Sequence, residues 1–161
     1  MLNQLMLAMC EFDRGVPHRI QHFTKVHAYC RLIGQEEGLS PRQMEILEAA
    51  AYTHDIGIKP ALEKFGSAAG PLQEQEGPAC ARKMLEELGF DGDLIERVCW
   101  LIAHHHTYQD VTSLDHRILL EADFLVNSFE DHLAPEAIIT FRNHVFRSES
   151  AISMLNDMWG L

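Results

Sequence analysis

The sequence lacks paired cysteines, long apolar runs and sequence repeats. Its four cysteines are scattered and no C-x-x-C spacing is present, so we expect neither a zinc knuckle nor a thioredoxin-type site. Scattered cysteines are typical of core residues in a reduced protein. No apolar run approaches the roughly 20 residues that span a bilayer, and the apolar first segment lacks a basic n-region. These absences predict a cytoplasmic protein with no signal peptide and no membrane partner.

Basic residues are also few. The 161-residue chain has 24 acidic against 13 basic residues, a formal net charge of -11. This balance argues against a nucleic acid as partner. It remains compatible with a small anionic substrate, because a metal ion or a few local cations can reverse the sign inside a pocket. The length suits one domain, which we place at residues 1–161.

The sequence has no segment with sustained period-2 alternation, so we predict no strand. Apolar residues instead recur with helical spacing, and Ser40-Pro41-Arg42-Gln43 has the pattern of a capping box. We predict an irregular lid at 60–71, with at most one short helical turn. The fold class is all-α, a compact single-domain bundle of seven to nine helices. The predicted helices are 2–13, 17–37, 41–55, 72–88, 93–106, 114–131, 135–146 and 149–158.

Histidine is frequent, with ten in the chain, and three of them are consecutive at His104, His105 and His106. Successive residues of a helix point about 100° apart. At most two of these three side chains can therefore face one site. The alternative for the whole run is a polar helix end.

Two further polar residues interrupt apolar helix faces. His22 shares a face with Val26 and other apolar residues, and Asp123 lies within the apolar segment "RILLEADFLVN". An ionised aspartate in such a place needs a counter-charge, a metal ion or several donors. The alternatives are a core histidine bonded to a carbonyl and an ion pair of Asp123 with Arg117 or Arg142.

The stretch "AYTHDIGIKP" places His54 and Asp55 where an apolar helix stops. Helical spacing puts His54 on the same face as Leu47 and Ala51, which directs it to the core. The helix dipole disfavours a carboxylate at this end unless the carboxylate binds a cation. The alternative is a pair that caps a helix end. Taken together, four helices each direct a histidine or aspartate inward, a donor set that suits iron, manganese, zinc or nickel.

The order His22, His54-Asp55, Asp123 on a helical scaffold resembles the HD-domain superfamily of metal-dependent phosphohydrolases. The matching segments are "HFTKVHAYC", "AAYTHDIG" and "LLEADFLVN". The resemblance covers about residues 18–130, and the helices at about 135–159 lie outside it. A single HD domain is therefore the expected fold.

The resemblance implies a divalent transition metal, one or two ions of iron, manganese, nickel, cobalt or zinc. In a mononuclear site the four ligands are His22, His54, Asp55 and Asp123. In a dinuclear site Asp55 bridges both ions, and Glu76 with His105 completes the second position.

The resemblance also implies catalytic roles. Asp55 or Glu76 orients and deprotonates the attacking water, and Lys59 and His104 neutralise charge on the phosphoryl group. The expected activity is a phosphatase or phosphodiesterase acting on a small phosphorylated molecule, a nucleotide or another phosphoester. The alternatives are a di-iron oxygenase of the same superfamily and a non-catalytic metal- or ligand-binding module. A homodimer is the expected assembly.

Overall fold

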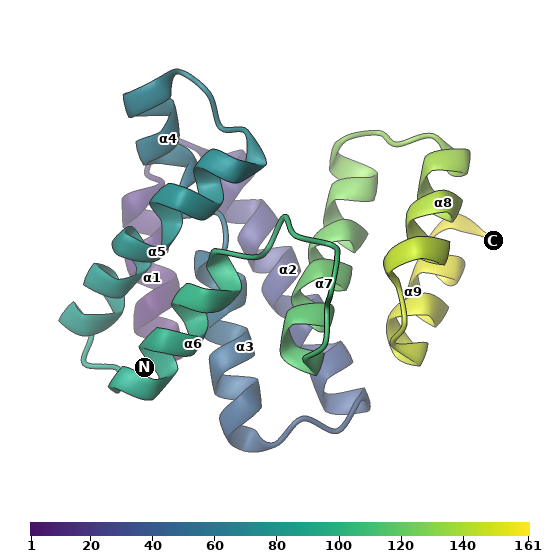
Figure 1. Ribbon diagram of the computed structural model, residues 1–161, viewed down its shortest axis with the longest axis horizontal. Helices are drawn as coiled ribbons and strands as arrows, with labels where there is room; N and C mark the ends of the chain where they lie inside the picture. The colour runs from purple at the N-terminus through teal and green to yellow at the C-terminus, as the bar shows by residue number, and fades with distance from the viewer.

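The structure, a computed structural model, describes residues 1–161 and contains nine α-helices and no strand, which confirms the all-α class. Figure 1 shows the helices grouped around α2 and α3, with α8 and α9 together at one end. The helices are α1 (Leu2–Phe12), α2 (Pro17–Glu36), α3 (Pro41–Thr53), α4 (Ile58–Phe65), α5 (Gly70–Glu87), α6 (Gly92–Ile102), α7 (Leu114–Glu130), α8 (Pro135–Val145) and α9 (Glu149–Trp159).

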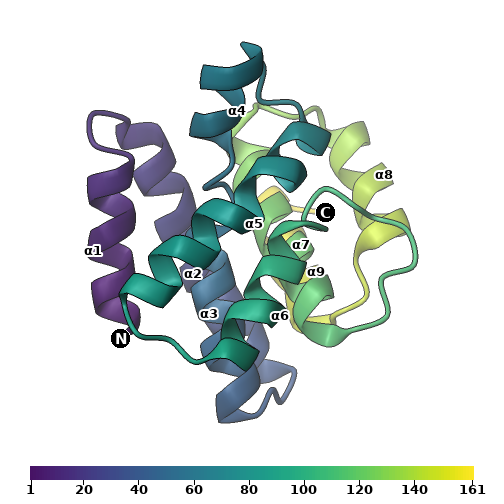
Figure 2. The same cartoon turned by 60° about the vertical axis from the view of Figure 1, so that its left-hand side comes forward.

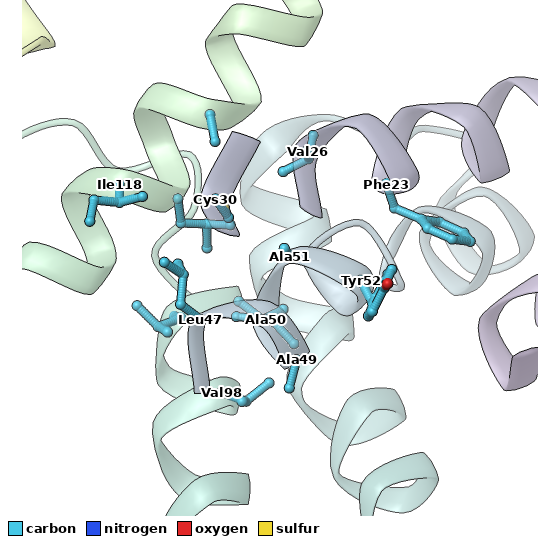
Figure 3. Packing of buried hydrophobic residues seen from close by; sticks show 14 of the residues in the cluster. Phe23, Val26, Cys30, Leu47, Ala49, Ala50, Ala51, Tyr52, Val98 and Ile118 are labelled. Atoms are coloured by element: carbon cyan, nitrogen blue, oxygen red, sulfur yellow. The ribbon is translucent and has the colours of Figure 1, made fainter. Parts of the chain in front are cut away.

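Helix α3 lies at the centre and contacts α1, α2, α6 and α7. Its second half is apolar all round, because Ala49, Ala50 and Ala51 are all fully buried. Figure 3 shows these small side chains surrounded by residues of neighbouring helices, among them Val26 and Val98. Small residues let the neighbouring backbones approach closely, so the end of α3 is held in the interior. The capping box that begins this helix is also present, with Ser40 and Gln43 bonded reciprocally.

The predicted irregular lid at 60–71 is wrong in its first half. Residues 58–65 form α4, which begins before Pro60 and ends at Gly66 in the left-handed region, with φ 66°. A proline in the first turn costs a helix little, because the first amides have no intrahelical partner. Only residues 66–69 separate α4 from α5. The second difference is at α6, which ends at Ile102, so His104 to His106 lie in the turn that follows.

Two glycines allow α5 to cross the segment between α3 and α4. A Cβ on Gly57 would lie 2.5 Å from the Gln73 carbonyl oxygen and 2.8 Å from the Gly77 nitrogen. A Cβ on Gly77 would lie 2.6 Å from Cγ2 of Ile102. No side chain fits at either position, so the backbones meet directly. This contact fixes which face of α5 is turned towards the end of α3.

The C-terminal helices pack as a pair on α7, as both Figure 1 and Figure 2 show. Phe124 stacks on Phe141 with ring centroids 3.7 Å apart, and Phe146 meets both rings edge-on. The buried Glu121 carboxylate accepts hydrogen bonds from the amides of Arg147 and Ser148 where α9 begins. No helix in the structure has both the length and the apolar character needed to cross a membrane.

Candidate metal centre

The inward-facing histidines and aspartates gather in one buried place between α2, α3, α7 and the turn after α6. They form two groups. Within each group, the atoms that could bind a metal ion all lie within 4.8 Å of one another. We call them the first group and the second group. The first group is His22, His54 and Asp123, and the second group is Asp55, His105 and His106.

The first group converges on a single point. His22 Nε2 lies 3.1 Å from Asp123 Oδ1 and 3.2 Å from His54 Nε2, and His54 Nε2 lies 3.4 Å from the same aspartate oxygen. All three side chains are buried, with His54 fully so. The aspartate is thus not paired with Arg117 or Arg142, which were the alternatives from the sequence.

Asp55 joins the two groups through its two oxygens. Its Oδ2 lies 3.3 Å from His22 Nε2 and 3.5 Å from His54 Nε2. Its Oδ1 lies 3.5 Å from His105 Nε2. One carboxylate oxygen therefore faces each group, which is the placement that a bridging ligand between two ions would need.

Each imidazole is oriented by a bond to its other nitrogen. His22 Nδ1 donates to Glu130 Oε2 at 2.8 Å, His54 Nδ1 to the Ala51 carbonyl at 2.8 Å, and His105 Nδ1 to the Ile102 carbonyl at 2.6 Å. In a neutral ring these bonds leave an Nε2 lone pair directed at the centre. Support of this kind for the second nitrogen is the usual surrounding of a metal-binding histidine.

These residues fit a divalent transition metal. Asp123 Oδ1 is buried and no donor reaches it in hydrogen-bonding geometry. When the imidazoles are neutral, only their lone pairs and those of the carboxylates surround this oxygen, and these repel one another unless a positive charge lies between them. A mixture of imidazole and carboxylate donors is the set that iron, manganese, cobalt, nickel and zinc accept.

The protein's own electrostatics show the same need for positive charge. Burial disfavours a charged His22, but the nearby carboxylates of Asp123, Asp55 and Glu130 outweigh burial and raise the pKa of His22 to about 9. Burial alone would raise the pKa of Asp123, yet His22 and His54 hold it well below its usual range. Without a metal ion, a proton on His22 supplies the missing charge.

Glu76, which the resemblance offered as a ligand of the second ion, is not brought to the centre. Its carboxylate pairs with Lys64 at the end of α4. Gln73 and Gly77 are the buried residues of this stretch of α5, and Glu76 points about 100° away from Gly77. Glu76 is therefore absent from the ligands that we propose.

Lys59 and His104 also lie apart from the centre. Lys59 is exposed, donates to the Phe12 carbonyl at 3.3 Å and lies over the Phe12 ring. His104 donates to the Trp100 carbonyl and stacks on the Trp100 ring at 4.1 Å. We therefore assign neither residue the role of neutralising charge on a phosphoryl group.

Gln73 and His106 also lie at the centre. Sequence reasoning did not consider Gln73, and it named His106 only as one of three consecutive histidines. Gln73 Oε1 is 2.9 Å from His106 Nε2 and 3.3 Å from His105 Nε2, and its amide nitrogen donates to the Ala68 carbonyl at 2.7 Å. Burial and the neighbouring His105 lower the pKa of His106 to about 4, so this ring is neutral at pH 7. The feature of the sequence that could have indicated Gln73 is its spacing: it lies four residues before Gly77, so both share the helix face that contacts Gly57.

A cavity of about 260 Å³ opens from the two groups. Arg19 on α2 is its cation, and the guanidinium Nη1 lies 3.3 Å from Asp13 Oδ1. A second hollow of about 430 Å³ lies along α8, but it has no convergent set of polar groups. The cavity is lined by His18, Arg19, His22, Asp55, Ile58, Gln73, His106, Asp123, Asn127 and Asp131.

The fold and the centre together define an all-helical protein with a buried cluster of histidines and aspartates that could hold a metal ion. The family model described as "HD domain" matches residues 19–140. The chain therefore belongs to the HD-domain family. It is similar to a solved structure described as a predicted HD superfamily hydrolase from an uncultured Thermotogales bacterium, with 25% sequence identity and a TM-score of 0.69. The match covers 98% of this chain and 84% of the other. No curated protein matches the chain.

Proposed function

We propose that the protein is a metal-dependent hydrolase of small phosphorylated molecules, with the first group and Asp55 as its metal ligands. The observation that carries this proposal is the convergence of His22, His54, Asp55 and Asp123 beside a polar cavity. Membership of the HD-domain family and the likeness to a predicted HD superfamily hydrolase support hydrolysis as the reaction. The phosphoester as substrate is our own inference.

The bound metal would supply a Lewis acid and lower the pKa of a coordinated water. The protein's own residues would do the rest. Arg19 faces the cavity and would bind oxygens of the phosphoryl group. Lys59 and His104 do not line the cavity, so they would not take this role. Asp55 Oδ1, which faces the second group, would orient the attacking water and accept its proton.

One specific observation favours a second ion. Asp55 Oδ1, His105 Nε2 and His106 form a further set of donors beside the first group. Two ions of iron would also suit a di-iron oxygenase, which is therefore our second candidate. Gln73 Oε1 occupies the neighbourhood of both histidine rings, so we propose that this second position binds more weakly than the first.

Metal content and phosphate release, measured on the same preparations, test the proposal. We expect one tightly bound transition metal and metal-dependent hydrolysis of p-nitrophenyl phosphate that stops when a chelator removes the ion. Asp55→Ala should abolish hydrolysis and lower metal content while circular dichroism keeps the helical signal. Dioxygen consumption by the iron form without phosphate release would favour the oxygenase. Failure to bind iron, manganese, cobalt, nickel or zinc would favour a non-catalytic binding module.

A cytoplasmic location and a homodimer remain predictions from the sequence. The net charge of -11 supports the further prediction that nucleic acid is not a partner.

A further inference from the structure

The lining of the metal cavity points to the part of the substrate that lies beyond the phosphoryl group. Ile58 is the one hydrophobic residue among the ten that line it, and none is phenylalanine, tyrosine or tryptophan. Proteins recognise nucleobases largely by stacking them on flat aromatic surfaces. The ring of His106 is covered on two sides: its centroid lies 4.0 Å from that of His105, and a Cβ on Gly70 would lie 3.0 Å from the ring. The exposed ring at the rim of the cavity is that of His18. The interior thus offers no apolar slot for a base.

The volume of the cavity also sets a limit on the substrate. Its 260 Å³ is smaller than the roughly 300–1,000 Å³ typical of pockets for drug-sized ligands. Part of this space must hold the phosphoryl group beside the metal ligands. The remainder suits a short polar chain or one small ring.

Two residues of α7 and Asp131, the residue that caps its C-terminal end, line the cavity in one row. Asp123, Asn127 and Asp131 follow each other at intervals of four, so they share a helix face. Asp123 belongs to the first group, and the other two lie about 6 and 12 Å further along the axis. The row runs from the place of the phosphoryl group towards solvent.

Asn127 and Asp131 have free hydrogen-bonding capacity. The side chain of neither residue takes part in a hydrogen bond or ion pair within the protein, and Asn127 is half-buried. An amide can donate and accept, and a carboxylate accepts from two hydroxyls, so the pair matches the hydroxyl groups of a polyol. The carboxylate of Asp131 would also repel a second phosphate at the far end.

We propose that the cavity selects the phosphomonoester of a small polyhydroxylated molecule, a sugar or polyol monophosphate, and that Asn127 and Asp131 determine this specificity by binding its hydroxyls. The proposal rests on the proposed hydrolase function. In the reaction, the oxygen of water forms a bond to phosphorus and the bond from phosphorus to the alcohol oxygen breaks. The leaving alkoxide takes up the proton that the water loses. The products are inorganic phosphate and the free polyol.

Ribose 5-phosphate and AMP are a matched pair for the test, because AMP carries the same phosphorylated ribose with a base attached. With the metal-loaded protein, we expect kcat/KM for ribose 5-phosphate to exceed that for AMP at least tenfold. We expect ADP to be poorer still. Equal or greater activity on AMP, in a preparation that hydrolyses p-nitrophenyl phosphate, would overturn the specificity proposal and leave the hydrolase standing. No hydrolysis of any phosphoester would instead overturn the proposed function.

Variants separate recognition of hydroxyls from structural damage. Asn127→Leu and Asp131→Asn should each raise KM for ribose 5-phosphate about three- to tenfold, the size expected for one lost hydrogen bond. The rise should be smaller for p-nitrophenyl phosphate, which has no hydroxyl to bind, and for 2-deoxyribose 5-phosphate. Asn3→Leu on α1, outside the cavity, is the matched control. An equal loss on all three substrates would overturn the role of these residues.

Binding decides the proposal even without turnover. Calorimetric titration of ribose 5-phosphate and of AMP into the protein should give the tighter binding for ribose 5-phosphate. Tighter binding of AMP would overturn the inference, whatever the activity of the preparation.

Discussion

The two halves of the metal centre differ in how completely they are built. In the first group the imidazoles of His22 and His54 are held by Glu130 and the Ala51 carbonyl, and a buried aspartate oxygen has no donor. In the second group, Gln73 from α5 already bonds to the ring of His106. The first group needs a positive charge, either a metal ion or the proton on His22, whereas the second is partly satisfied by the neutral amide of Gln73. The comparison teaches that similar donor residues can be left in need of a cation in one place and bonded within the protein in another, and we therefore expect the first group to bind metal more tightly.

Substitution of Asp123 should have the largest effect, because it would remove the difference in metal binding between the two groups. Asp123→Asn keeps the shape and removes the charge on which both histidines converge. We expect metal content to fall to background and hydrolysis to drop by more than the roughly 100-fold that loss of a supporting hydrogen bond can cost. Elemental analysis after dialysis and a phosphatase assay measure the two losses. Glu76→Gln is the control and should keep its metal, so loss of metal in Glu76→Gln alone would contradict our ligand assignment.

The next effect concerns the support of His22. Glu130 accepts the bond from His22 Nδ1 and pairs with Lys25 at 2.5 Å. Glu130→Ala should weaken metal binding about 10- to 100-fold, because the ring loses its orientation. Competition with a chelator of known affinity measures the change. Lys25→Met leaves the bond between Glu130 and His22 in place, so an equal loss in both variants would show that charge, and not orientation, matters.

Metal affinity should also depend on pH. The pKa of His22 is raised to about 9 without a metal, so below pH 9 a proton must leave Nε2 before a cation can bind. Displacement of one proton predicts that affinity rises about tenfold per pH unit up to about pH 9. Titrations with zinc between pH 6 and 9 check this slope. The same shift stabilises the metal-free fold fully below pH 6.5, and this contribution is lost as pH rises through 9. A flat affinity would contradict the protonated resting state.

The smallest expected effect concerns the metal affinity of the second group. Gln73→His replaces the amide oxygen with a further imidazole beside His105 and His106. We expect the variant to bind the second ion more tightly than the unaltered protein does, although still with lower affinity than the first ion. Elemental analysis at increasing metal concentration gives the stoichiometry. Gln75→His, at an exposed position of the same helix, should leave the affinity of the second position unchanged.

Much of the fold and part of the centre could be predicted from the sequence. Helical periodicity and the capping pattern at Ser40 gave eight of the helices with small errors at their ends. The inward direction of His22, His54 and Asp123 followed from their places on apolar faces. These features are local, so a single segment carries enough information to predict them.

The parts that could not be predicted depend on contacts between segments. The rotation of α5 is set by the direct contact of Gly57 with Gly77, which turns Gln73 inward and Glu76 towards Lys64. The directions of His104 and His106 depend on where α6 ends. A helix through His106 was the prediction, whereas the turn after Ile102 sends His105 and His106 to the centre and His104 onto Trp100.

The distribution of the ligands along the chain has a consequence for how the protein is made. His22 comes from α2, and the aspartate that completes the first group comes from α7, so a ribosome must release most of the chain before the site can exist. A metal that joins these helices closes a long loop and favours the folded state by mass action, about 2.7 kcal/mol at a free concentration 100 times its Kd. In cells short of the metal, the metal-free protein would then be less stable to unfolding, and its abundance would follow the metal supply.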